Sequence, residues 1–466
     1  MNVVDVPARR PQMFESAIGS RRTQQFLERL ERARAAQGQH TLWHVNSTAR
    51  GGGVAEMLQS ILSYLVGAGI ACRWIVVEGN ERFFEVTKGL HHHLHASPGG
   101  GDLDGDARAV YEETLAGEAE AIVEVVRPGD VVILNDPQTL GLAPSLEKSG
   151  ARTIFTSHVG ADAADERTRA AWSFLEPYVT ATQRQVFTRQ QYVWAGLDPH
   201  RVAVIPPCLD AFSAKNQDLD DATVDAILAS AGIVAGGSGS ARFSRQDGSV
   251  GTVTTRAEMV ETAPIEADRR IATQVSRWDP LKDPAGVMAG FVRQVPAESD
   301  VHLVLAGPAP QAVADDPESQ RVLDELRTAW ERLPAADRAR VHIACLPMDD
   351  VEQNAATVNA LQRRSDVVVQ KSLAEGFGLT VAEAMWKGRA TIGSRVGGIQ
   401  DQIEHGRSGL LLDDPRAVDD FGQTLAALLH DAPRRAALGA AACERVADRY
   451  LAPDHLTSYL DLVDSL

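Results

Sequence analysis

Lys371-Ser-Leu-Ala-Glu-Gly-Phe-Gly-Leu-Thr-Val-Ala-Glu-Ala-Met-Trp386 is the stretch that decides the fold of this chain. A short apolar strand, Asp366–Gln370, is predicted to lead into it. Gly376 and Gly378 then predict a tight turn, and a helix is expected to begin near Leu379. A buried strand that passes through a glycine turn directly into a helix is typical of a parallel α/β sheet.

Two carboxylates bracket this turn. Glu375 precedes it, and Glu383 lies about one turn inside the predicted helix. The free amides of a helix N-terminus can bind phosphates, and carboxylates at the same edge can hold sugar or ribose hydroxyls. Taken alone, the stretch is equally compatible with an ordinary turn and two solvated glutamates, because short glycine motifs occur often by chance.

Short apolar runs alternate with helical stretches in two separate series. The first series is Thr41–Asn46, Arg73–Val77, Asp130–Leu134, Thr153–Thr156 and Arg201–Ile205. The second is Arg270–Ser276, Val301–Leu305, Val341–Cys345, Asp366–Gln370 and Ala390–Gly393. This alternation predicts two doubly wound α/β domains, each with its ligand edge at the carboxyl ends of the strands.

Composition and pattern also suggest where the domains divide. We expect a first domain over 1–215, a connector over 216–268 and a second domain over 269–446. The connector contains the glycine- and serine-rich tract 235–251, which predicts a flexible segment. We expect the helix at about 447–466 to pack back onto the first domain.

The bulk composition excludes several classes of protein. With 46 basic and 63 acidic residues among 466, the net charge of −17 argues against binding to nucleic acid or to an anionic membrane surface. No stretch approaches the length of a membrane span, and the N-terminus lacks the apolar core of a signal peptide, so a cytoplasmic location is expected. The 4 cysteines have no short spacing, which disfavours a disulfide framework or a zinc site.

A histidine cluster, His91-His-His93 with His95, invites a metal interpretation. Contact of His91 with a sugar is the better interpretation, because the run is contiguous and lacks acidic or cysteine partners at ligand spacing. We therefore expect no metal site and no cofactor.

Three glycines, Gly51, Gly52 and Gly53, separate the strand Thr41–Asn46 from the predicted helix Val54–Val66. Such a loop lets backbone amides approach a ligand closely. It lacks the G-x-G-x-x-G spacing of a dinucleotide fingerprint, so a tight packing turn is the alternative.

Two cations, Arg277 and Lys282, follow the first strand of the second series in an otherwise acidic protein. Arginine can hold a phosphate with two hydrogen bonds and lysine as a point charge, so the pair could neutralise a departing diphosphate. The alternative is a surface pair balanced by Asp279 and Asp283. Because the glutamates and a further glycine pair (397–398) also follow strands of this series, all these groups are expected at one sheet edge.

These motifs resemble the signature of the retaining glycosyltransferases of glycosyltransferase family 4. The resemblance implies the GT-B fold, with two facing Rossmann-like domains and a deep cleft between them. Within that family the chain is most similar to the glycosyltransferring trehalose synthases and the trehalose phosphorylases. The matching segments are His44–Met57, Phe83–Lys88, Asp136–Thr139, Gln274–Asp279 and Glu375–Gly388.

The resemblance also implies residue roles. Arg277 and Lys282 would hold the donor diphosphate, Glu375 would contact the donor sugar and Glu383 would bind the nucleotide ribose. The nucleobase would lie near Leu346. Two further segments would complete the nucleotide site. They are the helix start, with Phe377, Gly378, Leu379 and Thr380, and the glycine loop, with Gly51, Gly52 and Gly53.

On the acceptor side, His91, Asp136 and Gln138 would bind sugar, and His158 would join the catalytic group. The implied reaction transfers glucose from a nucleoside-diphosphate glucose to glucose or a related sugar, giving α,α-trehalose without a protein nucleophile. Two alternatives stay open: a trehalose phosphorylase that uses inorganic phosphate, and a non-catalytic nucleotide-sugar-binding protein. The expected partners are small sugars and nucleotide sugars, and a homodimer is compatible with the sequence.

Overall fold

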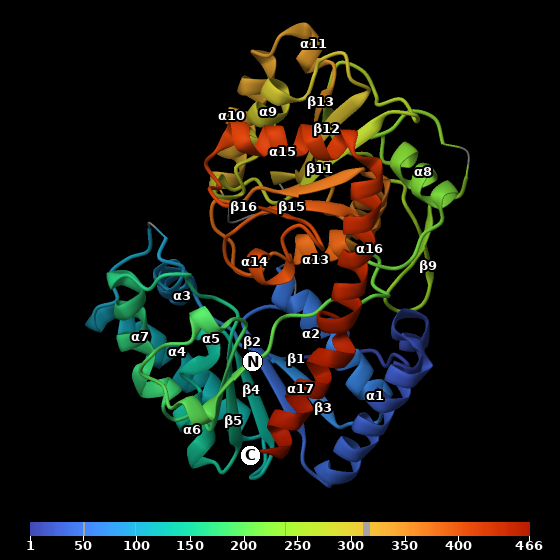
Figure 1. Cartoon of the computed structure of the whole chain (residues 1–466). Helices are drawn as coiled ribbons and strands as arrows, with labels where there is room; N and C mark the ends of the chain where they lie inside the picture. Colours follow the sequence, from blue (N-terminus) through green and yellow to red (C-terminus); the bar gives the residue numbers. More distant parts are fainter. Residues whose placement is uncertain (50–51, 98, 238, 311–316) are drawn as a thin grey trace. The chain divides into compact units, whose positions relative to one another are not determined.

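The computed structural model describes residues 1–466 except 50–51, 98, 238 and 311–316. The chain forms two units, one of Met1–Asp210 with Arg449–Leu466 and one of Ala211–Asp448 (Figure 1). Each unit is built on its own seven-stranded sheet with helices packed against it. The predicted α/β class with two Rossmann-like domains is therefore confirmed.

The sheet of the first unit has the strand order β1-β3-β2-β4-β5-β6-β7. All neighbouring strands pair in parallel except the edge strand β1, which runs antiparallel to β3. Strands β2 and β4 are buried along their whole length, as expected for central parallel strands covered on both faces. The strands are β1 (Asn2–Val4), β2 (Leu42–Asn46), β3 (Cys72–Val76), β4 (Val131–Asn135), β5 (Arg152–Ser157), β6 (Arg184–Phe187) and β7 (Val202–Val204).

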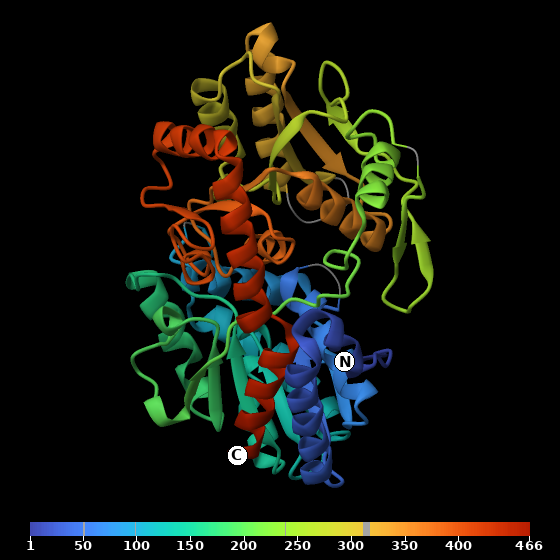
Figure 2. The same ribbon diagram turned by 45° about the vertical axis from the view of Figure 1, so that its right-hand side comes forward.

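Eight α-helices flank this sheet in the described part of the first unit: α1 (Glu15–Gln37), α2 (Gly53–Gly67), α3 (Glu81–Leu94), α4 (Gly105–Val123), α5 (Pro137–Leu140), α6 (Ala143–Lys148), α7 (Glu166–Val179) and α17 (Ala452–Asp464). Short 3₁₀ turns lie at Pro11–Phe14, Gln190–Tyr192 and Pro199–Arg201. Helix α17 runs beside α1 in both views (Figures 1 and 2). The buried Arg29 side chain of α1 binds Asp461 and Asp464 of α17 at 2.7 and 2.8 Å.

The second unit repeats this plan with the strand order β10-β13-β12-β11-β14-β15-β16. Again all pairs are parallel except the edge strand β10, which is antiparallel to β13. The strands are β10 (Glu258–Val260), β11 (Arg270–Val275), β12 (Val301–Pro308), β13 (Val341–Leu346), β14 (Val367–Gln370), β15 (Ala390–Ser394) and β16 (Leu410–Leu412).

Apolar layers cover both faces of this second sheet. Leu303 and Leu305 of β12 belong to one buried cluster, whereas Val304 and Ala306 belong to the other, as the alternation of side chains along a strand requires. The helices of this unit are α8 (Asp221–Ser230), α9 (Pro284–Gln294), α10 (Pro317–Glu331), α11 (Ala335–Arg338), α12 (Val351–Arg364), α13 (Leu379–Trp386), α14 (Ile399–Gln402), α15 (Val418–His430) and α16 (Ala432–Arg449). A 3₁₀ turn spans Pro280–Lys282.

The glycine- and serine-rich tract is more ordered than its composition predicts. It contains β8 (Arg242–Ser244) and leads into β9 (Val250–Thr252), and the two strands pair as an antiparallel hairpin. Phe243 of this hairpin is buried in the apolar cluster that also includes Leu361 of α12. The tract is thus attached to the second unit through its core.

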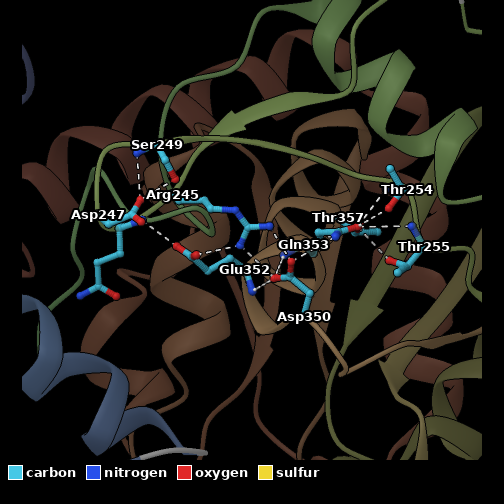
Figure 3. A network of polar contacts seen from close by, with 10 residues as sticks. Arg245, Asp247, Ser249, Thr254, Thr255, Asp350, Glu352, Gln353 and Thr357 are labelled. Atoms are coloured by element: carbon cyan, nitrogen blue, oxygen red, sulfur yellow. Dashed lines mark hydrogen bonds and ion pairs between the residues drawn. The ribbon is translucent and has the colours of Figure 1, made fainter. Parts of the chain in front are cut away.

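A polar network also fixes the hairpin to the N-terminus of α12 (Figure 3). Arg245 contacts Asp350 at 2.6 and 3.2 Å and Glu352 at 3.0 Å. Asp350 also caps α12 by accepting from the amides of Glu352 and Gln353, both at 3.1 Å. The amide oxygen of Gln353 accepts from the Thr254 amide at 2.9 Å, so both arms of the hairpin are bound to the same turn of α12.

We expect Arg245→Met to lower the unfolding free energy by about 1 kcal/mol at pH 7, because the ion pairs of this network are partly exposed. The hydrogen bonds from Arg245 lower the pKa of Asp350. That stabilisation is present above the unfolded-state pKa of about 3.9 and is lost as the pH falls below it. Urea unfolding of both proteins should therefore differ at pH 7 and converge as the pH is lowered below about 4. A difference that stays constant across that range would contradict this account.

Within the described residues, no helix combines the length and the apolar character needed to cross a bilayer. All four cysteines are free thiols, in agreement with the sequence-based expectation.

Candidate active site

The turn between β14 and α13 is built from close backbone contacts. Gly378 caps α13 with a φ of +81°, which favours glycine. A Cβ atom on Gly397 would lie 1.7 Å from the carbonyl oxygen of Glu375, and the Gly398 amide donates to the carbonyl of Gly376 at 2.8 Å. The glycine pair after β15 and the glycine turn after β14 are therefore packed together at one sheet edge, as the sequence predicts.

An ion pair joins the two predicted motifs at this edge. The Lys282 Nζ lies 2.7 Å from Glu375 Oε2, and the Ser372 hydroxyl donates to the same oxygen at 3.1 Å. Both charged side chains are largely buried, with exposed fractions of 15% and 13%. Gln274 of β11 places the cation, because its amide nitrogen donates to the Lys282 carbonyl at 2.8 Å. A bound phosphate could take the place of the glutamate as the partner of this ammonium.

The residue after Lys282 is anchored by a second, more deeply buried cation. Asp283 has a left-handed backbone with a φ of +46° and caps α9 by accepting from the Gly286 amide at 3.1 Å. Its other carboxylate oxygen pairs with the ammonium of Lys371, whose side chain is fully buried. No sequence pattern predicts this role for Lys371, although it is the first residue of the decisive stretch.

Arg277 lies near the surface. Its guanidinium is 63% exposed and stands 3.6 Å from Asp279, which is the surface pairing that the sequence left as an alternative. The neighbouring Trp278 is buried, and its indole donates to the carbonyl of Pro308 at 2.7 Å. The backbone beside Arg277 is therefore fixed at the carboxyl end of β12, while the guanidinium extends outward.

Glu383 is buried in α13, with its side chain only 5% exposed. One oxygen, Oε1, lies 3.8 Å from the Nζ of Lys215. The other, Oε2, is buried and accepts no hydrogen bond from any described residue. Burial lowers the pKa of Lys387, which follows one turn later and donates to the Glu383 carbonyl at 3.1 Å. Sequence reasoning missed both lysines.

The other residues that the sequence predicts to bind the donor nucleotide sugar lie around the start of α13 and at the end of a neighbouring strand. Leu379 is the first residue of α13, and Thr380 donates from its hydroxyl to the Gln370 side chain at 3.1 Å. Phe377 is buried, and its carbonyl accepts from Gln402 at 2.5 Å. Leu346 ends β13 with its side chain in the core, so any contact with a ligand would involve its backbone.

In the first unit, the predicted glycine loop is only partly described. Gly51 lies outside the described residues. Gly52 has a φ of +84° and precedes α2, which begins at Gly53.

A buried polar group lies at the carboxyl ends of β4 and β5. The His158 amide donates to Asp136 Oδ1 at 2.7 Å, and the His158 ring lies 3.4 Å from the Asn135 side chain. Asp136 has a positive φ of 61°, which is uncommon for a residue other than glycine. Burial raises the pKa of Asp136 to about 7 and lowers that of His158 to about 4, because it disfavours the charged form of each.

Two further predicted sugar contacts belong to this unit. Gln138 stands in the first turn of α5, and its Oε1 is buried without a hydrogen bond from the described residues. His91 lies in α3 with its ring centroid 4.6 Å from that of His95, whose Nδ1 pairs with the Gly160 carbonyl at 2.9 Å. Nowhere in the described chain do three or more histidine, cysteine or acidic side chains form a group that could hold a metal ion.

Both units match known families. The profile "Trehalose synthase, N-terminal domain" matches residues 44–194, and "Glycosyl transferases group 1" matches residues 255–445. The trehalose synthase of Pyrococcus horikoshii is 30% identical over 457 residues, which cover 97% of this chain and 95% of that protein. The chain belongs to the trehalose synthase family.

A trehalose phosphorylase and a solved trehalose-phosphate synthase are more distant matches. The trehalose phosphorylase of Pleurotus sajor-caju is 25% identical over 401 residues, covering 78% of this chain and 50% of that protein. Among solved structures, an α,α-trehalose-phosphate synthase (UDP-forming) from Burkholderia vietnamiensis superposes with a TM-score of 0.66 at 16% identity, covering 91% of this chain and 96% of that one. This likeness assigns the GT-B glycosyltransferase fold, and the family membership makes the protein a glycosyltransferase.

Proposed function

We propose that the protein is a retaining glycosyltransferase that moves glucose from a nucleoside-diphosphate glucose to glucose or a related sugar, forming α,α-trehalose. The observation that carries the proposal is the largely buried Lys282–Glu375 pair, which lies beside the glycine-capped start of α13. An ammonium, the amides at a helix start and a carboxylate in one place suit a phosphate joined to a sugar. Family membership supports the same assignment.

In this proposal the second unit binds the donor. Lys282, assisted by Arg277 and the amides at the start of α13, stabilises the negative charge that develops on the departing diphosphate. Glu375 holds hydroxyls of the donor glucose, and Glu383 accepts from the ribose hydroxyls. Because these side chains can neutralise the leaving group, we propose that the transfer needs no metal ion.

In this proposal the first unit binds the acceptor sugar. Asp136 and Gln138 accept hydrogen bonds from sugar hydroxyls, and the neutral His158 ring contributes a polar contact without adding charge. The acceptor attacks on the face that the diphosphate leaves, and a phosphate oxygen takes the proton of the attacking hydroxyl. The α configuration of the donor is retained in this way without a covalent intermediate on the protein.

Turnover tests the proposal directly. Purified protein would be incubated with UDP-, ADP- or GDP-glucose and ¹³C-labelled glucose, and the product would be identified by NMR. We expect free nucleoside diphosphate and α,α-trehalose in equal amounts. A product of inverted configuration would contradict the retaining mechanism.

A trehalose phosphorylase is the second candidate, because relatives of that name match most of this chain. It would cleave trehalose with inorganic phosphate to give glucose 1-phosphate and glucose, without any nucleotide. The buried Glu383 favours the nucleotide donor, because a phosphate ion offers no ribose hydroxyl to this carboxylate. Binding of a nucleotide sugar without turnover of any kind would instead indicate a binding protein.

The acceptor step should depend on the ionisation of Asp136. The pKa of this carboxyl is raised to about 7, so its ionised fraction increases between pH 6 and 8. If the carboxylate accepts from the sugar, kcat/KM for the acceptor should rise with pH and level off above about pH 8. Asp136→Asn should remove that rise and lower kcat/KM at pH 8 by about 10- to 100-fold.

The exposed carboxylate variant Asp102→Asn serves as the control for this measurement and should keep the wild-type profile. Finding the same pH dependence in Asp136→Asn would assign the titration to another group.

A further inference from the structure

The carboxylate of Glu383 poses a physical problem within the second unit. Its Oε2 is buried and receives no hydrogen bond from the residues that the structure describes. Leaving a buried charged oxygen unpaired is costly, so such an atom in a folded protein calls for a partner. Under the proposed function that partner is a ribose hydroxyl, which is a hydrogen-bond donor.

The only cation paired with this carboxylate in the described chain is Lys215, 3.8 Å from Oε1. Lys215 does not belong to any motif of the sheet edge. It lies in the segment 214–217, which follows the point at which the chain leaves the first unit and enters the second. One counter-charge of the carboxylate therefore comes from the connecting segment, and the ammonium of Lys387, directly after α13, also acts on it electrostatically.

The segment 214–217 is fixed to α12 by hydrogen bonds at both ends. The Asn359 side chain donates to the carbonyls of Ala214 and Gln217 at 3.1 and 2.9 Å. The guanidinium of Arg363 also donates to the Gln217 carbonyl, at 2.9 Å. The backbone around Lys215 is held in place by these bonds.

Helix α13 binds the same segment. The Trp386 indole donates to the Asn216 carbonyl at 3.1 Å. The Lys387 ammonium donates at 3.1 Å both to the Asn216 side chain and to the carbonyl of Glu383. The connecting segment and the helix that carries Glu383 are therefore joined as one rigid part of the site.

We propose that Lys215 is a positioning residue for the donor nucleotide: its ammonium draws Glu383 Oε1 toward itself and leaves Oε2 presented to the ribose hydroxyls. The inference rests on the proposed function, which assigns Glu383 to the ribose, and it extends the donor site to the connecting segment. At 3.8 Å the contact is an ion pair longer than a hydrogen bond, so the charge of Lys215 is the property that counts.

Removal of single ribose hydroxyls tests this role without requiring turnover. The full chain would be titrated by calorimetry with UDP, ADP and GDP and with their 2′-deoxy and 3′-deoxy forms. For the best ligand, wild-type protein should lose about 10- to 100-fold in affinity when the hydroxyl that binds the carboxylate is absent. Lys215→Met should bind the ribose form about 10-fold more weakly, and its ratio of ribose to deoxyribose affinity should fall below about 3-fold.

Matched variants separate this role from general loss of structure. Lys215→Arg keeps the charge and should restore the ribose preference, whereas Glu383→Gln should abolish it. Arg293→Met removes an exposed cation of α9 in the same unit and should leave the preference unchanged. Circular dichroism verifies that each variant is folded. If Lys215→Met does not fold, the ratio of ribose to deoxyribose affinity is measured on Lys215→Gln instead.

The outcomes distinguish the two proposals. A folded Lys215→Met protein with an undiminished ribose preference would overturn the inference alone. Wild-type protein that binds a nucleoside diphosphate but ignores the ribose hydroxyls would overturn it as well. Failure of the wild type to bind any of the three nucleotides would overturn the proposed function, and the inference with it.

Discussion

Replacing Lys282 by alanine is expected to lower kcat by about 10²- to 10³-fold, equivalent to roughly 3 to 4 kcal/mol of lost transition-state stabilisation. The ammonium lies in a largely buried place, 2.7 Å from Glu375, where water screens its charge weakly. Charge develops on the diphosphate as the bond to the sugar breaks, so the loss should appear mainly in kcat. Steady-state kinetics at saturating donor and acceptor would measure it.

Two variants give this result its meaning. Lys282→Arg keeps a positive charge at a slightly different position and should retain more activity than the alanine variant. Arg293→Ala removes a cation that is 59% exposed on α9, and its kcat should equal that of the wild type. A kcat within about threefold of normal for Lys282→Ala would exclude the phosphate role.

The second large effect concerns stability. Asp283→Asn should lower the unfolding free energy by about 3 kcal/mol, because it leaves the fully buried ammonium of Lys371 without its carboxylate. Asparagine tolerates the left-handed backbone at this position and can still cap α9, so the loss would isolate the charge. Urea unfolding of the full chain would report it as a lower transition midpoint.

The double variant Asp283→Asn/Lys371→Met provides the decisive comparison. With the buried charge removed as well, most of the lost stability should return, since neutral replacements of a buried ion pair are often tolerated. Asp300→Asn breaks a pair in which the aspartate is 46% exposed and should cost less than about 1 kcal/mol. Equal losses of unfolding free energy for Asp283→Asn and Asp300→Asn would show that the burial of Lys371 does not increase the cost of removing its partner.

The central strands could be predicted because burial on both faces gives them continuous apolar runs. All ten expected strands overlap observed ones, whereas β1, β6, β10 and β16 of the two large sheets and both strands of the β8–β9 hairpin were missed. β1, β10 and β16 have only three residues each, too few for a pattern. In β6 the buried Gln185 interrupts the apolar run; its side-chain nitrogen donates to Thr182, a local bond that composition does not reveal.

The site was predictable where its residues follow strands of one sheet. Parallel strands bring their carboxyl ends to the same edge, so Lys282 and Glu375 could be expected together despite their separation in the chain. Partners that reach a site from outside the strand–turn–helix units leave no such signal. Lys215 approaches Glu383 from the connecting segment. Arg245 reaches Asp350 from a hairpin in a tract whose composition predicts a flexible linker.

The first unit is discontinuous in sequence, since it consists of 1–210 and 449–466. Within it the Leu209 amide donates to the Tyr450 carbonyl at 2.7 Å, and the Ala452 amide donates to the Leu209 carbonyl at 3.1 Å. The second unit is thus inserted between two neighbouring points of the first. A ribosome delivers α17 only after the whole second unit, so the first unit cannot be completed until the second has been synthesised. The adjacent ends also mean that a short peptide could replace the inserted unit and yield the first unit as a separate protein.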